Sequence, residues 1–307
     1  MQDIFLNKVL AIALLQNIIQ TDLFKPGRKM NKLSTQDRVQ ILNALSEGVG
    51  INAAARMTGK SKNTILKLLA GVGQACALYQ DHAMRNLTIK KVQVDEIWSF
   101  IGMKQKNAPI ENPEGYGDCY TFTAIDPETK LMPCWLVGTR SRQCTFDFME
   151  DLAGRLANRV QLTSDGMNAY PDAVEAAFHG NVDFGMLNKS YANEHGLKEA
   201  KRRYSPATMT SCEKLTVYGK PDEAHISTSH VERANLSMRM GMRRFTRLTN
   251  AFSKKLENHM HAVSFYFMVY NFVKIHNTIK TTPAMQAGVT TYLWSIEDIV
   301  MMSETAS

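Results

Sequence analysis

The spacing of apolar residues in the first third of the chain predicts short helices. In residues 33–48 the apolar positions recur at near-helical spacing behind a Ser-Thr pair. Residues 51–58 form a second, alanine-rich segment that stops at Gly59. A third segment begins at Ser61, and we expect the glycines of residues 71–73 to end it. Helix, short helix, tight turn and helix is the order found in a helix-turn-helix.

From about residue 90 onward the pattern becomes that of an α/β fold. Strands are expected where apolar and β-branched residues alternate, and helices where they recur every three or four residues. The expected strands are 91–102, a hairpin over 119–138, 160–166 and a strand near 182–186, followed by a polar loop to about residue 228. The expected helices are 145–159, 168–178, 229–247 and 250–276. This order predicts a mixed sheet flanked by helices.

These patterns divide the chain into four parts. We expect an N-terminal extension at 1–29, an all-α helix-turn-helix domain at 30–90, an α/β domain at 91–290 and a tail at 291–307. Residues 1–20 are apolar, but Lys8 and several amides interrupt them. A bilayer takes roughly 20 predominantly apolar residues, so we expect an amphipathic helix here, or a true start at Met30, and no membrane partner.

Composition narrows the setting. The 307 residues carry a net charge of +7, and the five cysteines form no CxxC pair. Neither a zinc ribbon nor a disulfide framework is indicated, and a reducing, cytoplasmic setting is expected. If the predicted helix-turn-helix binds DNA, the protein is expected to associate with the nucleoid.

The first of two basic regions coincides with the predicted helix-turn-helix. Residues 28–91 contain eleven basic and three acidic residues. Helix surfaces are often rich in lysine only for solubility, but the turn pattern favours DNA binding. The residues expected to contact DNA from the third helix are Lys60, Ser61, Lys62, Asn63 and Lys67.

The second basic region carries one sign of charge only. Residues 233–255 contain seven basic residues and no acid. A solvated helix face normally mixes both signs, so this stretch predicts a polyanionic partner. The arginines expected to contact DNA here are Arg233, Arg243, Arg244 and Arg247.

Three acids lie where a catalytic site is expected. Asp95 interrupts an apolar strand, Asp165 ends another, and Glu232 opens a basic helix. Glu96 is expected to face the other side of its strand because side chains alternate. If the first three carboxylates converge, their oxygens can hold two hard divalent cations. Isolated acids are more often solvated surface groups, so position alone does not decide the matter.

Sequence blocks around these acids resemble a known family. VDEIWSF, LTSDGMNAY and SHVERANLSMRMGMRRFTRLTNAFSKK resemble the three acidic blocks of bacterial DDE transposases, most closely those of the insertion-sequence-one family. The C-terminal YNFVKIHNTIKTTPAMQAG is similar to the ending common in these enzymes, and the resemblance covers about residues 33–290. One departure is that no cysteine zinc motif precedes the helix-turn-helix.

The resemblance implies a fold and a reaction. The fold is an RNase H-like, five-stranded mixed sheet flanked by helices, with Asp95, Asp165 and Glu232 as ligands of two Mg²⁺ or Mn²⁺ ions. Arg239, seven residues after Glu232 and on the same helix face, is implied as a further catalytic residue. The implied partners are double-stranded DNA, as element ends and as target, and further copies of the chain.

Two other functions fit parts of this pattern. A non-enzymatic regulator needs only the helix-turn-helix, and a nuclease on the same fold needs the acids but performs no joining. Metal-dependent nicking separates the first from a transposase, and strand transfer separates the second.

Overall fold

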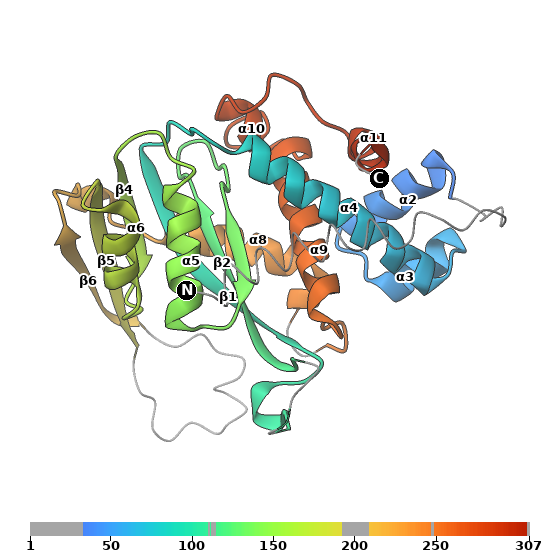
Figure 1. Ribbon diagram of the computed structural model, residues 1–307, viewed down its shortest axis with the longest axis horizontal. Helices are drawn as coiled ribbons and strands as arrows, with labels where there is room; N and C mark the ends of the chain where they lie inside the picture. Colours follow the sequence, from blue (N-terminus) through green and yellow to red (C-terminus); the bar gives the residue numbers. More distant parts are fainter. Residues whose placement is uncertain (1–32, 110, 112–114, 192–208, 247–248, 306–307) are drawn as a thin grey trace. The chain divides into compact units, whose positions relative to one another are not determined.

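In the described part of the computed structural model, six strands form one mixed sheet (Figure 1). Their spatial order is β3-β2-β1-β4-β5-β6. Along the chain the strands are β1 (Lys91–Ile101), β2 (Gly117–Ile125), β3 (Trp135–Gly138), β4 (Val160–Asp165), β5 (Val182–Tyr191) and β6 (Met209–Tyr218). The described residues are 33–109, 111, 115–191, 209–246 and 249–305.

The direction of the strands changes in the middle of this sheet. β1, β2 and β3 are joined as antiparallel neighbours, which confirms the hairpin predicted over 119–138. β1, β4 and β5 are parallel, and β6 returns antiparallel to β5. β4 pairs with β1 only from Lys91↔Gln161 to Gln93↔Thr163. Beyond Gln93 and Thr163 the two strands are no longer paired, and a crevice at such a point is where α/β sheets bind ligands.

The helices cover both faces of the sheet and extend beyond one end of it. α5 and α6 lie on one face and contact each other, whereas α8 packs on β1 and β2 from behind in the view of Figure 1. The α-helices are α2 (Thr35–Ser46), α3 (Ile51–Thr58), α4 (Lys62–Ala83), α5 (Arg142–Ala153), α6 (Tyr170–Phe178), α8 (Ser229–Gly241), α9 (Leu256–Met268), α10 (Pro283–Gln286) and α11 (Ile296–Thr305). Single turns occur at Gln105–Asn107, Glu223–His225 and Arg243–Phe245, and a π-helical turn at Val269–Val273.

Buried apolar residues on β1 and β2 hold these layers together. Ile97 and Phe122 are fully buried, and the Phe122 ring lies 5.5 Å from the Phe148 ring of α5. On the other face, Val231 and Met238 of α8 are buried against the sheet. Since burial of such side chains contributes about 1.5–3 kcal/mol each, the two helical layers are strongly attached to the strands that carry the acids.

The sheet has one strand more than the five that the resemblance implies. β6 lies in the stretch predicted as a polar loop, and it pairs with β5 along most of its length. Most of its side chains are exposed, from Met209 to Thr216. An edge strand with little buried surface shows no apolar alternation, which explains why its sequence did not indicate a strand.

The predicted helix stop at residues 71–73 is wrong. Ser61 caps α4 as expected, accepting a hydrogen bond from Thr64 N at 3.1 Å, but the helix continues to Ala83. A Cβ at Gly73 would lie 2.4 Å from the His261 carbonyl oxygen of α9. Gly73 therefore allows two helices to cross at close distance rather than ending one of them.

The two predicted C-terminal helices are also shorter than expected. α8 ends at Gly241, six residues before the predicted end at 247, and a single turn follows at Arg243–Phe245. α9 begins at Leu256 and not at 250, because residues 249–255 form an irregular segment whose Ser253 pairs with Ile101 at the end of β1.

Residues from Asp37 onward form one compact unit, in which α4 contacts both α9 and α11. The first unit ends at Gln36, and residues 33–36 are its described part. The predicted N-terminal extension at 1–29 lies outside the described residues. Within the described ranges, no helix has the length and apolar character needed to cross a bilayer.

Candidate active site

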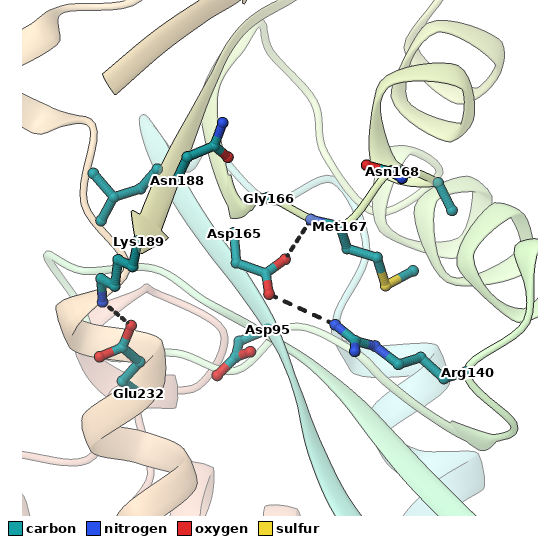
Figure 2. Close-up of a pocket in the computed structure, with 11 residues that line it drawn as sticks. Asp95, Arg140, Asp165, Gly166, Met167, Asn168, Asn188, Lys189 and Glu232 are labelled. Atoms are coloured by element: carbon teal, nitrogen blue, oxygen red, sulfur yellow. Dashed lines mark hydrogen bonds and ion pairs between the residues drawn. The ribbon is translucent and has the colours of Figure 1, made fainter. Parts of the chain in front are cut away.

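Asp95, Asp165 and Glu232 line a single pocket of about 930 Å³ (Figure 2). They come from β1, the end of β4 and the first turn of α8. Two cationic side chains, Arg140 and Lys189, line the same pocket. The structure thus brings the three sequence-predicted acids together, although up to 137 residues separate them along the chain.

The position of Asp165 follows from where β4 leaves β1. Asp165 is the last residue of β4, two residues beyond the last pair with β1. Its Oδ1 accepts a hydrogen bond from Met167 N at 3.1 Å, which turns the chain away from the strand. The carboxylate is therefore held at the crevice between the diverging strands.

Asp95 is held by the chain of α8 as well as by its own strand. Its Oδ1 accepts from Glu96 N at 2.8 Å, and its Oδ2 accepts from Asn235 Nδ2 at 2.9 Å. Asn235 is buried, and its Oδ1 accepts from Thr123 Oγ1 at 3.0 Å. Burial, and next the nearby charge of Asp165, raise the pKa of Asp95 to about 6. A cation in the pocket would offset both effects.

A second contact fixes the start of α8 to β1. Gln93 Oε1 accepts from His230 N at 2.9 Å and from Val231 N at 3.2 Å. These amides belong to the first turn of the helix, where no intrahelical acceptor exists. Gln93 and Asp95 therefore both anchor α8, which places Glu232 beside the strand that carries Asp95.

Glu232 is the most open of the three acids. Its side chain is 47% exposed. Its Oε1 accepts hydrogen bonds from Thr228 Oγ1 at 2.6 Å and from Lys189 Nζ, the contact drawn in Figure 2. Lys189 Nζ also donates to Thr228 Oγ1 at 3.1 Å, so the three side chains form a closed triangle.

Glu96 is a candidate functional residue that was not among the site residues predicted from the sequence. It does face away from α8, as alternation requires, since its partners are Tyr170 of α6 and Arg140 before α5. However, one oxygen of its carboxylate lies within 4.8 Å of oxygens of Asp95 and Asp165. Glu96 therefore faces the other side of its strand, as predicted, and yet its carboxylate lies close to the site, because Asp165 lies in the gap between the strands.

The Glu96 carboxylate is enclosed rather than open to the pocket. Only 2% of its side chain is exposed, the Tyr170 hydroxyl donates to Oε1, and Arg140 Nε donates to Oε2 at 3.2 Å. Burial, and next the charge of Asp165, raise the pKa of Glu96 to about 7. Burial also raises the pKa of Tyr170 well above its ordinary value, so this phenol stays a hydrogen-bond donor.

Arg140 links this buried acid to the pocket. Its Nη2 lies 3.2 Å from Glu96 Oε2 and 3.8 Å from Asp165 Oδ2, and its guanidinium lies over the Tyr120 ring. The Arg140 side chain is 44% exposed. Glu96 thus orients a permanently charged group toward the same space that the three acids line.

The donor set fits hard divalent cations. Asp95, Glu96 and Asp165 each offer a carboxylate oxygen, and these oxygens lie within 4.8 Å of one another. Glu232 adds a fourth carboxylate to the pocket wall. Mg²⁺ and Mn²⁺ prefer carboxylate oxygens, and clustered carboxylates with raised pKa values are stabilised by such ions. The pocket is therefore suitable for metal binding, with Glu96 as a close neighbour of the predicted ligands.

Arg239 lies two turns beyond Glu232 on α8 and does not line this pocket. It is half-buried on the helix. Its predicted catalytic role stays a prediction.

The residues predicted to contact DNA divide into four groups, of which Arg244 forms the last. Lys62, Asn63, Lys67, Arg233 and Arg243 are exposed. Lys60 is ion-paired with Asp37 at 2.9 Å, and Ser61 is the cap of α4. Arg247 lies outside the described residues.

Arg244 differs from the other predicted contacts. It is directed inward, where its Nη1 donates to Ser253 Oγ at 3.0 Å, and burial lowers its pKa to about 10. Ser253 Oγ is in turn 2.8 Å from Nδ1 of the buried His259. This network connects the segment after α8 to α9, and the predicted DNA contact of Arg244 stays a prediction.

The two basic regions of the sequence meet in the structure. Lys62 of α4 is close enough to Lys254 to lower its pKa, after the larger effect of desolvation. Lys254 Nζ lies over the Phe252 ring at 2.9 Å from its centroid. Two like charges that lie close enough to interact favour an anionic partner between or over them.

Several of these side chains had no signal in the sequence. Arg140, Lys189 and Asn235 lie far from one another along the chain, and each reaches the acids only through the fold. Asn235 is the exception that periodicity could have found, since it follows Glu232 by three residues and shares its helix face.

Comparison with known proteins gives no match in sequence, either to a protein-family model or to a curated protein. Solved structures similar to this chain include the piggyBac transposase synaptic complex with hairpin DNA, with TM-score 0.38 and 10% identity over 95% of this chain and 75% of that chain. A pre-cleavage Mos1 transpososome has TM-score 0.29 and 9% identity over 96% of this chain and 85% of that chain.

Another similar structure belongs to a different class of protein. The C-terminal lobe of a budding yeast Argonaute has TM-score 0.26 and 9% identity over 86% of this chain and 66% of that chain. Because these TM-scores are all below 0.5, we base the function on the geometry of the pocket.

Proposed function

We propose that this protein is a DNA transposase of the DDE type, whose sheet and helices form an RNase H-like catalytic core. The observation that carries the proposal is that Asp95, Asp165 and Glu232, from three separate elements, line one pocket together with Arg140 and Lys189. Acids alone would suit a structural cation. Acids with permanent cations beside them suit a phosphate ester, whose charge needs both metal ions and basic groups.

Asp95, Asp165 and Glu232 would hold two Mg²⁺ or Mn²⁺ ions. When bound, such ions activate the attacking oxygen and stabilise the leaving oxygen of a phosphoryl transfer. The protein's own contribution is to hold these carboxylates in place. Asn235 orients Asp95, and Gln93 holds the first turn of α8 from which Glu232 projects.

Arg140 would bind a phosphate oxygen of the strand in the pocket. Glu96 accepts from the guanidinium, and Tyr170 in turn donates to Glu96, so the orientation of Arg140 is fixed before DNA arrives. A pre-oriented cation stabilises developing negative charge without the cost of reorganising solvent.

The DNA duplex would extend from the pocket over the two basic regions. Lys62, Lys254, Arg233 and Arg243 are exposed cations of these regions, and Lys62 and Lys254 are near neighbours. α3 and α4, with their tight turn, would read the ends of the element as a helix-turn-helix. The narrower proposals are membership of the insertion-sequence-one family, action as a homo-oligomer, and strand transfer by a 3′-hydroxyl after cleavage by water.

The test is incubation of the full chain with labelled oligonucleotide duplexes from both flanks of its coding element, a supercoiled target plasmid, and Mg²⁺ or Mn²⁺. We expect metal-dependent nicks at the element ends and joined products in the plasmid. Asp165→Asn should abolish both. The matched control is Asp172→Asn, which neutralises an exposed, ion-paired carboxylate on α6 outside the pocket.

The possible products distinguish this proposal from its alternatives. Binding to the ends with no metal-dependent nicking would indicate a regulator. Nicking with no joined product would indicate a nuclease. Equal loss in Asp165→Asn and Asp172→Asn would show that the pocket is not the site of cleavage.

A further inference from the structure

Lys189 makes one contact in the pocket that the proposed reaction does not explain. It projects from β5 into the pocket, and its amino group contacts Glu232, one of the acids assigned to metal (Figure 2). Its side chain is 22% exposed, so it is neither a solvated surface lysine nor part of the core.

The contact engages the atom that a metal ion would need. Glu232 Oε1 accepts from both Lys189 Nζ and Thr228 Oγ1. A divalent cation bound by this carboxylate would compete with the ammonium for the same oxygen. It would also repel the ammonium, since like charges a few ångströms apart in a partly desolvated pocket interact strongly.

Arg140, the other cation in the pocket, is held differently. Its contacts are shared between Asp165 at 3.8 Å and the enclosed Glu96 at 3.2 Å. Glu96 is enclosed and does not line the pocket, so Arg140 has a partner besides the carboxylate that faces the pocket. The contact of Lys189 with Glu232, by contrast, is with a carboxylate assigned to metal, and its flexible four-carbon stem allows the ammonium to move.

We propose that Lys189 is a phosphate-binding residue that couples metal binding to DNA binding. When Glu232 binds a divalent ion, Lys189 would lose its contact with this carboxylate. The released ammonium would then bind a phosphate of the bound strand. The inference rests on the proposed function, because it needs Glu232 as a metal ligand and DNA as the substrate. No bond is made or broken in the exchange.

The exchange requires reciprocal effects of metal and DNA. If metal releases Lys189 for DNA, metal must tighten DNA binding, and DNA must tighten metal binding by the same factor. Removing the ammonium should therefore strengthen metal binding in the absence of DNA and weaken the coupling in its presence. A purely structural ion pair would produce neither effect.

The experiment compares the wild type with Lys189→Met and Lys214→Met. Lys214 is exposed on β6, opposite Leu187 in the register, so its replacement makes the same chemical change outside the pocket. Mn²⁺ binding to the full chain without DNA is measured by calorimetry. We expect Lys189→Met to bind Mn²⁺ about two- to fivefold more tightly than the wild type, the range set by a partly exposed ion pair.

DNA binding is then measured with an element-end duplex, in EDTA and in Ca²⁺, over a series of salt concentrations. We expect Ca²⁺ to tighten binding by the wild type and by Lys214→Met, and to have less effect on Lys189→Met. The slope of log affinity against log salt in Ca²⁺ should fall by about one for Lys189→Met, as for loss of one phosphate contact. Lys189→Arg keeps the charge and should retain most of the coupling.

The outcomes separate this inference from the proposed function. If the wild type binds Mn²⁺ and nicks DNA, but Lys189→Met has wild-type Mn²⁺ affinity and wild-type coupling, the inference is overturned and the proposed function stands. If the wild type neither binds Mn²⁺ nor nicks DNA, the proposed function itself has failed. Thermal unfolding of each variant identifies any that do not fold, in which case Lys189→Arg decides by whether coupling follows the charge.

Discussion

The two sides of the pocket are built by different means. On the strand side, Asp95, Glu96 and Asp165 are held by β1, β4 and buried partners such as Asn235 and Tyr170. On the helix side, Glu232 is 47% exposed, and two side chains, Thr228 and Lys189, contact one of its oxygens.

This difference separates two requirements of a metal site. Burial and the nearby charge of Asp165 raise the free energy of the ionised forms of Asp95 and Glu96, and only a rigid frame keeps these carboxylates within 4.8 Å of one another. The strand side is thus a preformed cluster of carboxylates that is suitable for binding cations. The more exposed carboxylate of Glu232 on the helix side can change partners, so it is better suited to respond to substrate.

The largest effects should come from replacing a carboxylate on either side with an amide. We expect Asp95→Asn and Glu232→Gln each to lower cleavage about a thousandfold, since a metal ligand contributes several kcal/mol to the transition state. The two should differ in stability without metal. Asp95→Asn should raise the melting temperature at pH 8 by relieving crowding, whereas Glu232→Gln should not. Calorimetry in EDTA measures this difference, and equal shifts would contradict the comparison.

The pH dependence of stability should come from the strand side. Asp95 and Glu96 have pKa values of about 6 and 7 in the folded protein, above their ordinary values of 3.8 and 4.5. The folded state therefore binds their protons more tightly, and the stability from this source is lost as pH rises from about 4 to about 7. For Asp95 the loss is up to about 3 kcal/mol.

Chemical denaturation in EDTA at a series of pH values measures this loss as the difference between the wild type and Asp95→Asn. The difference should grow through this pH range and shrink when Mn²⁺ is added. A difference that stays constant with pH would mean that Asp95 is ionised without strain.

Asn235→Ala should weaken the connection between the two sides. It removes the donor to Asp95 and leaves Thr123 without its acceptor on α8. Loss of a residue that orients a metal ligand costs about 10- to 100-fold in metal affinity or activity. Mn²⁺ affinity and nicking rate should both fall by this amount. Ser237→Ala, on a different face of α8, serves as the control. If Asn235→Ala has the same Mn²⁺ affinity and nicking rate as Ser237→Ala, Asp95 does not need Asn235 to orient it.

Arg239→Ala should have the smallest effect of these changes. Arg239 does not line the pocket, so the substitution should remove at most one charged hydrogen bond to DNA. We expect strand transfer to fall about tenfold while the melting temperature barely changes. Arg239→Lys should retain part of the activity. If purified Arg239→Ala joins DNA ends at the wild-type rate, Arg239 has no role in the reaction.

Local pattern was enough to place all three acids on their elements, and α8 begins at Ser229, where the helix that carries Glu232 was predicted to begin. Strand alternation around Asp95 and the short apolar run before Asp165 depend only on neighbouring residues, and the structure has strands there. The cap at Ser61 and the hairpin of β2 and β3 were equally local. The helix ends after residue 241 were not, because irregular contacts of Ser253 and Arg244 determine them.

The sequence by itself determined which residues carry charge and where strands and most helices begin. It also determined that Asp95 and Asp165 lie on strands and that Glu232 lies in the first turn of a helix. Only the tertiary structure decided that β1 and β4 part after Gln93, which opens the crevice for Asp165 and admits Glu96 from the opposite face. It also decided that Arg140 and Lys189 face those acids, and that Gly73 joins α4 to α9 instead of ending a helix. The reason is physical: alternation and helical spacing are properties of neighbours, whereas a shared pocket depends on distances between chain segments that no local pattern records.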